Sequence, residues 1–334
     1  MRIIRNLEEI TAPFKGAVVT IGNFDGVHLG HREIFRLVVR RAAEMAGTSV
    51  VLTFVPHPLK VLAPARAPRL INTYAEKERL IEASCIDVLI SAPFTREFSA
   101  LPAARFVEEV LVKRIGLRHL IVGYDYAFGR GREGNVDFLR KKGEELGFAV
   151  EVLEPIAHGA EVYSSSRIRQ MIGEGQVEAA VAFLGRHFTL EGTVVHGDKR
   201  GQALGFPTAN LSLEKELLPQ PGVYAVKVKH GGAILDGVVN IGSNPTFPGG
   251  GLSVEVHLLD FQGALYGETL RLYFVKRLRD ERAFPSAEAL IAAIQQDIRQ
   301  ARDLLAQTRI VEYHEYLDCG AVGNDRPAET ATTL

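Results

Sequence analysis

The chain has 334 residues, of which 46% are hydrophobic, so it can bury the cores of about two domains and is not a disordered protein. Its 39 Lys and Arg residues nearly balance its 40 Asp and Glu residues, which disfavours non-specific nucleic-acid binding as the main role. Cys85 and Cys319 are too few for a disulfide framework, and no signal peptide or membrane-spanning stretch is recognisable, so we expect a soluble, cytoplasmic protein.

In the first part of the chain, short β-branched segments alternate with segments of helical periodicity. The predicted strands are continuous apolar runs, as expected for strands covered on both faces: 17–24, 49–54, 87–91, 119–123 and 148–155. Between the first two, apolar residues recur at helical spacing: Ile34, Val38, Ala42 and Met45. This order predicts a doubly wound parallel α/β domain over residues 1–185, with ligands at the carboxyl ends of its strands.

In the second part, closely spaced strands follow one another without helices between them. Gly231 and Gly232 predict a tight hairpin, and about five or six strands of this kind suggest a small closed antiparallel barrel. A helix is then predicted from Ser286, with these residues on one face: Leu290, Ile294, Ile298, Ala301 and Leu305. Barrel and helix would form a second domain over residues 186–310. The tail, residues 318–334, has almost no large apolar residue and is predicted to be disordered.

The first predicted strand runs directly into GNFDGVHLGH, residues 22–31. Glycines there allow the backbone to approach a phosphate, and the following helix directs its first amides at the same place. His28 and His31 could donate hydrogen bonds to a phosphorus centre under attack and to its leaving pyrophosphate. A metal-binding pair or simple helix capping is the alternative. The candidate nucleotide-binding residues beside the histidines are Gly22, Asn23, Phe24, Asp25, Gly26 and Gly30.

A second glycine-rich segment formally matches the dinucleotide-binding pattern at Gly129, Gly131 and Gly134. In dinucleotide-binding folds these glycines follow the strand at once, whereas the residues YDYAF intervene here. Because Arg130 and Arg132 occupy the variable positions, we favour a flexible basic loop over a phosphorylated substrate and not a nicotinamide site.

The segment YSSSRIR, residues 163–169, begins another predicted helix. Its hydroxyl and guanidinium groups would suit triphosphate oxygens, which makes Ser164, Ser165, Ser166 and Arg169 candidates. Taken alone, the segment is more simply interpreted as a serine N-cap followed by surface arginines.

The second half lacks a GxxxxGK[ST] loop, so a kinase there must hold ATP in another way. Thr208 and Asn210 lie two residues apart on an extended segment, face the same side and offer hard oxygen ligands suited to Mg²⁺. On these residues alone, a turn that ends a strand is the simpler interpretation. The other candidate residues of this segment are Gly197, Lys199, Gly201, Gly205 and Pro207.

Taken together, GNFDGVHLGH, TFVPHP, VGYDYAFG and SSSRIR resemble the FMN adenylyltransferase half of the bacterial bifunctional riboflavin kinase/FAD synthetases. The second half adds GDKRGQALGFPTANL, PGVYAVKV, VVNIGSNPTF, EVHLLDF and YGETLRLYFVKRLRDE in the order expected for that family. The resemblance covers residues 18–305. It implies an enzyme that phosphorylates riboflavin with ATP to FMN, then transfers AMP from a second ATP onto FMN, giving FAD and pyrophosphate.

The resemblance also implies roles for single residues of the barrel. Thr208 and Asn210 would hold Mg²⁺ and ATP. Glu268 would act as general base toward the ribityl 5′-hydroxyl of riboflavin, which attacks the γ-phosphate. The loop that begins at Asn240 would close over nucleotide and flavin.

In the first half, the resemblance implies direct attack of the FMN phosphate on the α-phosphate of ATP. His28, His31, Arg169 and Mg²⁺ would align the groups and stabilise the developing charge. Asp125 matches the position that contacts flavin or nucleotide. Two departures from the family pattern are Ser166, where threonine is usual, and YDYAFG in place of the commoner DFRFG-like sequence.

Two other interpretations stay open. The chain could be a single-activity FMN adenylyltransferase with a degenerate kinase barrel, or a non-catalytic flavin-binding regulator. The PTAN segment with Glu268, and the intact pair His28 and His31, argue against both. An aminoacyl-tRNA synthetase also uses an HxGH-type motif, but KMSKS is absent. We expect ATP, riboflavin and FMN as partners, with no nucleic acid and no membrane, and the oligomeric state is left open.

Overall fold

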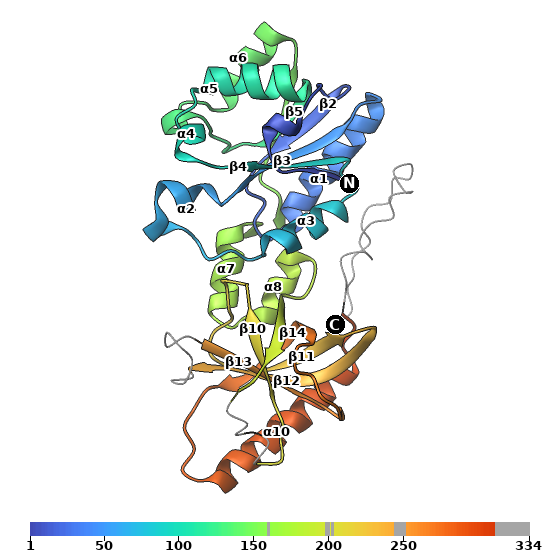
Figure 1. Cartoon of the computed structure of the whole chain (residues 1–334), viewed down its shortest axis with the longest axis vertical. Helices are drawn as coiled ribbons and strands as arrows, with labels where there is room; N and C mark the ends of the chain where they lie inside the picture. The colour runs from blue at the N-terminus through green and yellow to red at the C-terminus, as the bar shows by residue number, and fades with distance from the viewer. Residues whose placement is uncertain (159–160, 198–200, 202–203, 244–251, 311–334) are drawn as a thin grey trace.

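The structure is a computed structural model and describes residues 1–158, 161–197, 201, 204–243 and 252–310. An α/β unit and a β-barrel lie one above the other along the long axis of the molecule, with two helices between them (Figure 1). Cys319 and the tail 318–334 lie outside the described residues. Within the described part of the chain, no helix is both long enough and apolar enough to cross a membrane.

The α/β unit contains a six-stranded parallel sheet. Its strands, in spatial order, are β1 (Arg2–Ile4), β4 (Val88–Pro93), β3 (Ser49–Val55), β2 (Ala17–Ile21), β5 (Leu117–Gly123) and β6 (Ala149–Leu153). Every strand pair is parallel, which confirms the predicted doubly wound sheet. The edge strand β1 was not among the predicted strands, because three residues are too few to show a pattern.

Helices cover both faces of this sheet, which explains the continuous apolar runs of its strands. Helices α1 (Leu29–Glu44) and α3 (Tyr74–Glu82) pack on one face, where Val18 is buried. A π-helix, η3 (Phe106–Ile115), and α6 (Val136–Leu146) pack on the other. Shorter segments are η1 (Leu7–Glu9), α2 (Pro58–Leu62), η2 (Pro64–Arg66), α4 (Arg96–Ser99), α5 (Ala103–Arg105), η4 (Arg130–Arg132), β7 (Ala157–His158) and β8 (Glu161–Val162).

The strand order reverses its direction between β2 and β5. The chain passes from β2 to β3 on one side, while β5 pairs with β2 on the other. In open α/β sheets a ligand binds outside the carboxyl ends of the strands at such a point. The residues that follow β2, beginning at Gly22, and those that follow β5, including Asp125, therefore border the expected binding crevice.

The second unit is a closed six-stranded antiparallel barrel, as predicted. Its strands, in spatial order, are β10 (Ala209–Leu213), β13 (Leu252–Leu258), β12 (Ala233–Ser243), β11 (Gly222–His230), β14 (Thr269–Asp280) and β9 (Thr189–Val195). The predicted two-glycine hairpin joins β11 to β12, and Gly231 takes the positive φ of 57° that the turn requires.

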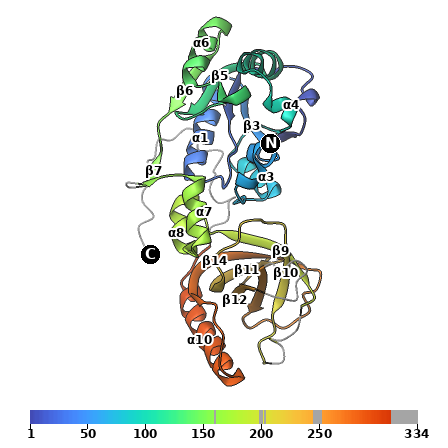
Figure 2. The same ribbon diagram turned by 90° about the vertical axis from the view of Figure 1, so that its left-hand side faces the viewer.

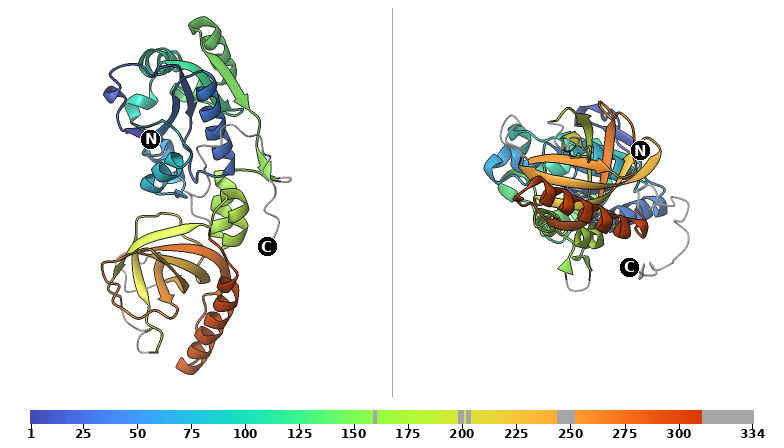
Figure 3. Two further views of the ribbon diagram at one scale, coloured as in Figure 1. Left: turned by 90° about the vertical axis from the view of Figure 1, so that its right-hand side faces the viewer. Right: turned by 90° about the horizontal axis from the view of Figure 1, so that it is seen from below.

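Helix α10 (Ala287–Ala306) runs along the outside of the barrel (Figure 3). Ser286 caps it as predicted, accepting a hydrogen bond from the backbone amide of Ala289 at 3.2 Å. Ala301 and Leu305 are fully buried against the barrel. The buried face also contains Asp297, which binds the Arg279 guanidinium of β14 at 2.9 Å and was not predicted.

Helices α7 (Ser165–Gly173) and α8 (Val177–Leu184) lie between the sheet and the barrel (Figure 2). Their apolar residues, among them Ile172 and Phe183, belong to the same buried cluster as Tyr224 and Phe274 of the barrel. Ile71 of the α/β unit belongs to the same cluster, so the two helices pack against both units, and the boundary at residue 185 stays a prediction.

Candidate functional site

The loop that follows β2 is held in a compact and unusual conformation. Phe24, Gly26 and Val27 have positive φ angles of 47°, 88° and 40°, although only glycine adopts this region readily. His28 then caps α1, because its Nδ1 accepts a hydrogen bond from the His31 amide at 3.4 Å. Helix capping, one of the alternatives, is thus part of the arrangement.

The two histidines lie against each other at the amino end of α1. Their ring centroids are 3.6 Å apart and the rings are nearly parallel. Burial, together with the charges of Arg186 and Arg169, lowers the pKa of His28 to about 3. Burial and the neighbouring His28, Lys77 and Arg186 hold the pKa of His31 well below its usual value. At neutral pH both rings are therefore uncharged, and each can donate one N–H to a phosphate oxygen.

Asp25 links this loop to the helix that begins with SSSRIR. Its buried carboxylate accepts hydrogen bonds from the amides of Ile71 and Asn72 and pairs with the Arg169 guanidinium at 2.7 Å. The Ser165 hydroxyl donates to the Asp25 carbonyl at 2.8 Å. The structure thus brings two of the predicted segments together. The Arg169 guanidinium forms an ion pair with Asp25.

The three neighbouring serines of this segment make different contacts. Ser164 is the N-cap of α7 and accepts from the Ser166 amide at 3.2 Å, as the simpler interpretation of this segment expects. Ser165 reaches the loop after β2, whereas Ser166 is exposed. Gly30, in α1, lies under this segment, since a Cβ there would come 3.1 Å from Tyr163.

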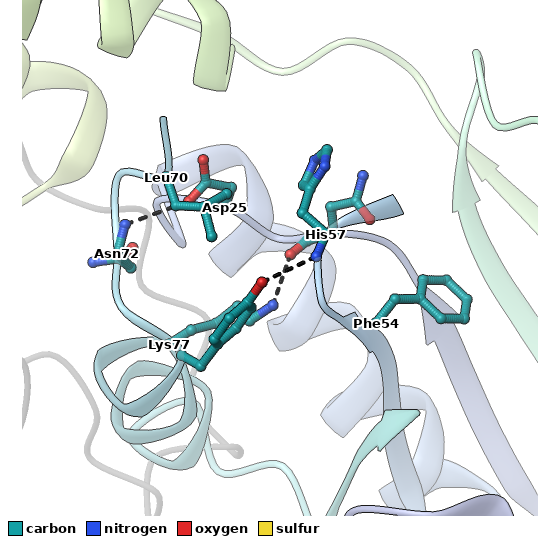
Figure 4. A pocket seen from close by; sticks show the side chains of 8 residues that line it. Asp25, Phe54, His57, Leu70, Asn72 and Lys77 are labelled. Carbon is teal, nitrogen blue, oxygen red and sulfur yellow. Dashed lines mark hydrogen bonds between the residues drawn. The ribbon is translucent and has the colours of Figure 1, made fainter. Parts of the chain in front are cut away.

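A small pocket opens beside the loop, at the carboxyl ends of β2 and β3 (Figure 4). It is lined by Asn23, Asp25, Phe54, His57, Leu70, Asn72, Tyr74 and Lys77. The Lys77 ammonium donates to the Asn23 carbonyl at 3.2 Å and to the Thr53 hydroxyl at 3.1 Å. Burial lowers the pKa of Lys77 to about 8. Sequence reasoning missed Lys77, since a single lysine on a helix face carries no motif.

Gly22 follows β2 and Asp125 follows β5, the two strands between which the strand order reverses. A Cβ at Gly22 would come 2.9 Å from the Phe24 ring, so only glycine leaves room for the fold of the loop. Asp125 is exposed, in the turn that follows β5. The contact of Asp125 with flavin or nucleotide stays a prediction.

The segment with the formal dinucleotide pattern forms a closed turn. Phe128 and Gly134 pair with each other, and the Arg130 amide donates to the Leu101 carbonyl at 3.0 Å. A Cβ at Gly134 would overlap the Phe128 ring. Gly129 and Gly134 are therefore required by close packing, whereas a Cβ at Gly131 would meet no atom within 4 Å. The turn is hydrogen-bonded to its neighbours, in contrast to the flexible loop that we predicted.

In the barrel, three polar residues occupy neighbouring positions on adjacent strands. Asn210 of β10 pairs with Glu255 of β13, which in turn pairs with Asn240 of β12. The Thr208 hydroxyl donates to the Glu255 carboxylate at 3.3 Å. Asn210 is buried, and its side-chain oxygen has no hydrogen-bond partner within the described part of the chain. Such an atom is costly unless a ligand completes it.

Two glycines make room for this row. A Cβ at Gly197 would lie 2.2 Å from the Asn210 amide nitrogen, and one at Gly201 would lie 2.4 Å from the Phe206 carbonyl oxygen and 3.3 Å from the Thr208 side chain. Gly205 has a positive φ of 88°, which the turn before β10 requires. The carbonyl of Pro207 lies 2.8 Å from a ring nitrogen of His257. The predicted Lys199 lies outside the described residues.

Glu255 is the functional candidate that sequence reasoning missed, and its surroundings differ from those of Glu268. The Glu268 side chain is 58% exposed and lies 3.5 Å from His230. Strand β9 separates it from Asn210, since Val194 of β9 donates to the Glu268 carbonyl. The alternation of the EVHLLDF strand could have identified Glu255, because it places this residue on the face opposite its buried apolar neighbours.

Comparisons with known proteins match the two parts of the chain to two families. Residues 11–167 match the FAD synthetase family, and residues 184–305 match the riboflavin kinase family. The bifunctional riboflavin kinase/FMN adenylyltransferase of Escherichia coli (strain K12) is 38% identical over 311 residues, which cover 92% of this chain and 99% of the relative. The protein of the same name from Pseudomonas fluorescens is 39% identical over 307 residues, covering 92% and 98%.

Among solved structures, a Streptococcus pneumoniae protein described as a macrolide-efflux protein has a TM-score of 0.81 and 32% identity, covering 90% of this chain and 98% of that one. Its description differs from the names of the sequence relatives. Near full-length similarity, two family matches in chain order and the observed pair of folds lead to one conclusion. The chain belongs to the family of bifunctional riboflavin kinase/FMN adenylyltransferases.

Proposed function

We propose that the two reactions of the family take place at the two polar clusters described above, one in each fold. The observation that carries this proposal is their separation: the stacked rings of His28 and His31 lie at the start of α1, whereas the Asn210 oxygen, which has no hydrogen-bond partner among the described residues, lies in the barrel. The barrel would phosphorylate riboflavin to FMN, and the α/β unit would transfer AMP to FMN. Riboflavin, FMN and ATP are the substrates that the family implies.

In the barrel, we assign the role of general base to Glu255 in preference to Glu268. A base must lie within hydrogen-bonding reach of the hydroxyl that it deprotonates, beside the phosphate-binding groups. Glu255 accepts from Thr208 and neighbours Asn210, whereas Glu268 is exposed and lies beyond β9. The 5′-oxygen of riboflavin would attack the γ-phosphorus, its proton would pass to Glu255, and ADP would leave.

The Mg²⁺ expected from the resemblance fits the donor set of this cluster. Among the described residues, no three His, Cys, Asp or Glu side chains form a metal cluster. The buried Asn210 side-chain oxygen has no hydrogen-bond partner in the part of the chain that the structure describes, and the Thr208 hydroxyl lies on the same segment. These are hard oxygen ligands of the kind that Mg²⁺ accepts beside phosphates and water. Bound there, Mg²⁺ would neutralise phosphate charge.

In the α/β unit, the FMN phosphate is itself the nucleophile, so no protein nucleophile is needed. A phosphate oxygen of FMN would bond to the α-phosphorus of ATP while the bond to the bridging oxygen breaks and pyrophosphate leaves. His28, His31 and the first amides of α1 would donate hydrogen bonds to the charge that develops. Arg169, bound to Asp25, would hold the loop and place positive charge beside it.

The direct test uses the full chain with riboflavin, ATP and Mg²⁺, followed by chromatographic separation of the flavins. We expect FMN to appear first and FAD later, and FAD to form from added FMN without riboflavin. Formation of FAD from added FMN, with no FMN formed from riboflavin, would support the alternative of a single-activity adenylyltransferase with a degenerate kinase barrel. Formation of neither product would contradict the proposal. A cytoplasmic location and the absence of a nucleic-acid partner stay predictions, supported by the composition.

A further inference from the structure

The loop that carries His28 depends on support from outside itself. Its residue Val27 is β-branched and has a φ of 40°, a conformation that such residues rarely adopt. Residues in such regions persist only where the surrounding structure imposes them. The groups that hold this loop therefore determine where the imidazole of His28 lies.

Arg186 supplies much of that support. Its guanidinium donates to the Gly26 carbonyl at 2.6 Å and to the Val27 carbonyl at 3.1 Å, the two peptide groups that precede His28. It also donates to the Leu184 carbonyl, at the end of α8, at 3.2 Å. Arg186 is only 8% exposed, and its hydrogen bonds to these carbonyls are buried. Bulk water therefore does not solvate the carbonyls.

The backbone of Arg186 is fixed on both sides. Gly185 ends α8 with a φ of 67°, and a Cβ there would lie 2.5 Å from Leu29 of α1. On the other side, Phe188 is buried in the barrel cluster, and its carbonyl accepts from the Phe274 amide at 2.9 Å. Through Arg186, the segment that leads into the barrel therefore holds the loop of the α/β unit in position.

We propose that Arg186 is a positioning residue for adenylyl transfer, supplied by the segment that joins the two folds. It fixes the peptide units before His28, and through them the imidazole and the first amides of α1. Without the guanidinium, the Gly26 and Val27 carbonyls would be buried without donors and the loop would move to satisfy them. The inference rests on the proposed role of His28.

The test compares full-length R186M and R186K with the parent protein. For each we would measure kcat and KM for FAD formation from FMN and for phosphorylation of riboflavin. In R186M, kcat for FAD formation should fall at least about tenfold with KM for FMN nearly unchanged, because misplacement by about 1 Å is enough for such a loss. Riboflavin phosphorylation should stay within about twofold of the parent. R186K, which keeps a charged donor, should give an intermediate kcat.

R79M is the matched control. Arg79 also bridges the two folds, contacting Glu191 of the barrel at 3.3 Å, but it does not touch the loop. Both activities of R79M should equal those of the parent.

The inference is overturned if R186M keeps the parent's kcat for FAD formation, if both activities fall together, or if R186K is no better than R186M. If R186M does not fold, as judged by circular dichroism, R186K alone decides: selective loss of FAD formation supports the inference and equal loss of both activities overturns it. A parent protein that makes no FAD from FMN would overturn the proposed function, and this inference with it.

Discussion

The barrel presents two glutamates whose environments differ. Glu255 receives the Thr208 hydroxyl and lies beside Asn210, so it can exchange a proton with a hydroxyl bound next to those groups. Glu268 is largely exposed, and solvent competes for its carboxylate. The family resemblance pointed to Glu268, whereas the cross-strand neighbours favour Glu255.

The variants E255Q and E268Q separate these assignments. E255Q should lower kcat for riboflavin phosphorylation by about 100-fold or more, the usual contribution of a general base, while E268Q stays within a few-fold of the parent. FAD formation from added FMN should be unchanged in both, which serves as the control for folding. The reverse result, with E268Q inactive and E255Q active, would restore the assignment made from the resemblance.

His28 predicts a dependence of stability on pH. Its pKa is about 3 in the folded protein and near 6.5 in an unfolded chain, so between these values the unfolded state binds the extra proton. Stability should therefore be complete above pH 6.5 and fall as the pH decreases toward 3. From pH 7.5 to 5.0 the loss caused by His28 is about 2 kcal/mol.

Urea unfolding of the parent and of H28N at these two pH values checks this prediction. H28N should lose about 2 kcal/mol less than the parent between pH 7.5 and 5.0. An identical loss in the two proteins would show that His28 does not carry this dependence.

At the scale of elements, the barrel places its candidate ligands by strand register and close backbone approach. Thr208, just before β10, and Asn210, within it, both lie beside Glu255 of β13, and Val195 at the end of β9 pairs with Asn210. Gly197, two residues beyond β9, lies where a side chain would overlap the Asn210 amide. A glycine is needed at position 197 because the Asn210 amide occupies the space that a side chain would take.

The variant G197A tests this close approach. The added methyl should displace the Asn210 amide and lower riboflavin phosphorylation about tenfold or more, while FAD formation from FMN is unchanged. G232A, in the hairpin between β11 and β12, is the control, because a Cβ there meets no atom within 4 Å. Equal kinase activity in the two variants would contradict the proposed role of this space.

At the scale of the molecule, the two folds share buried polar contacts as well as apolar packing. Lys215 follows β10 and is fully buried, with its ammonium 2.8 Å from Glu76 of α3. Burial opposes the charge of Glu76, but Lys215 and hydrogen bonds from Thr73 and Asn72 outweigh it and hold the pKa of Glu76 below its usual value. This pair joins the strand that carries Asn210 to the loop that binds Asp25.

Removing one partner of this pair should be costly. K215M leaves the Glu76 carboxylate buried without its counter-ion and should lower the free energy of unfolding by about 3–5 kcal/mol. The double variant K215M/E76Q, which has no buried charge left, should recover a large part of that loss. Urea or thermal unfolding measures both. A small effect of K215M would show that water reaches Glu76 when the lysine is absent.

The sequence by itself determined the two folds, their order and the segments that carry the chemistry, because apolar periodicity, turn glycines and motif residues are local properties of the chain. Only the tertiary structure decided which of these residues meet. Glu255 reaches Thr208 through the register of β10 on β13, and Arg186 reaches Gly26 from 160 residues away. Helices α7 and α8 pack with the barrel although they follow the α/β segment. Such contacts depend on register and on the packing of distant segments, which no local pattern records.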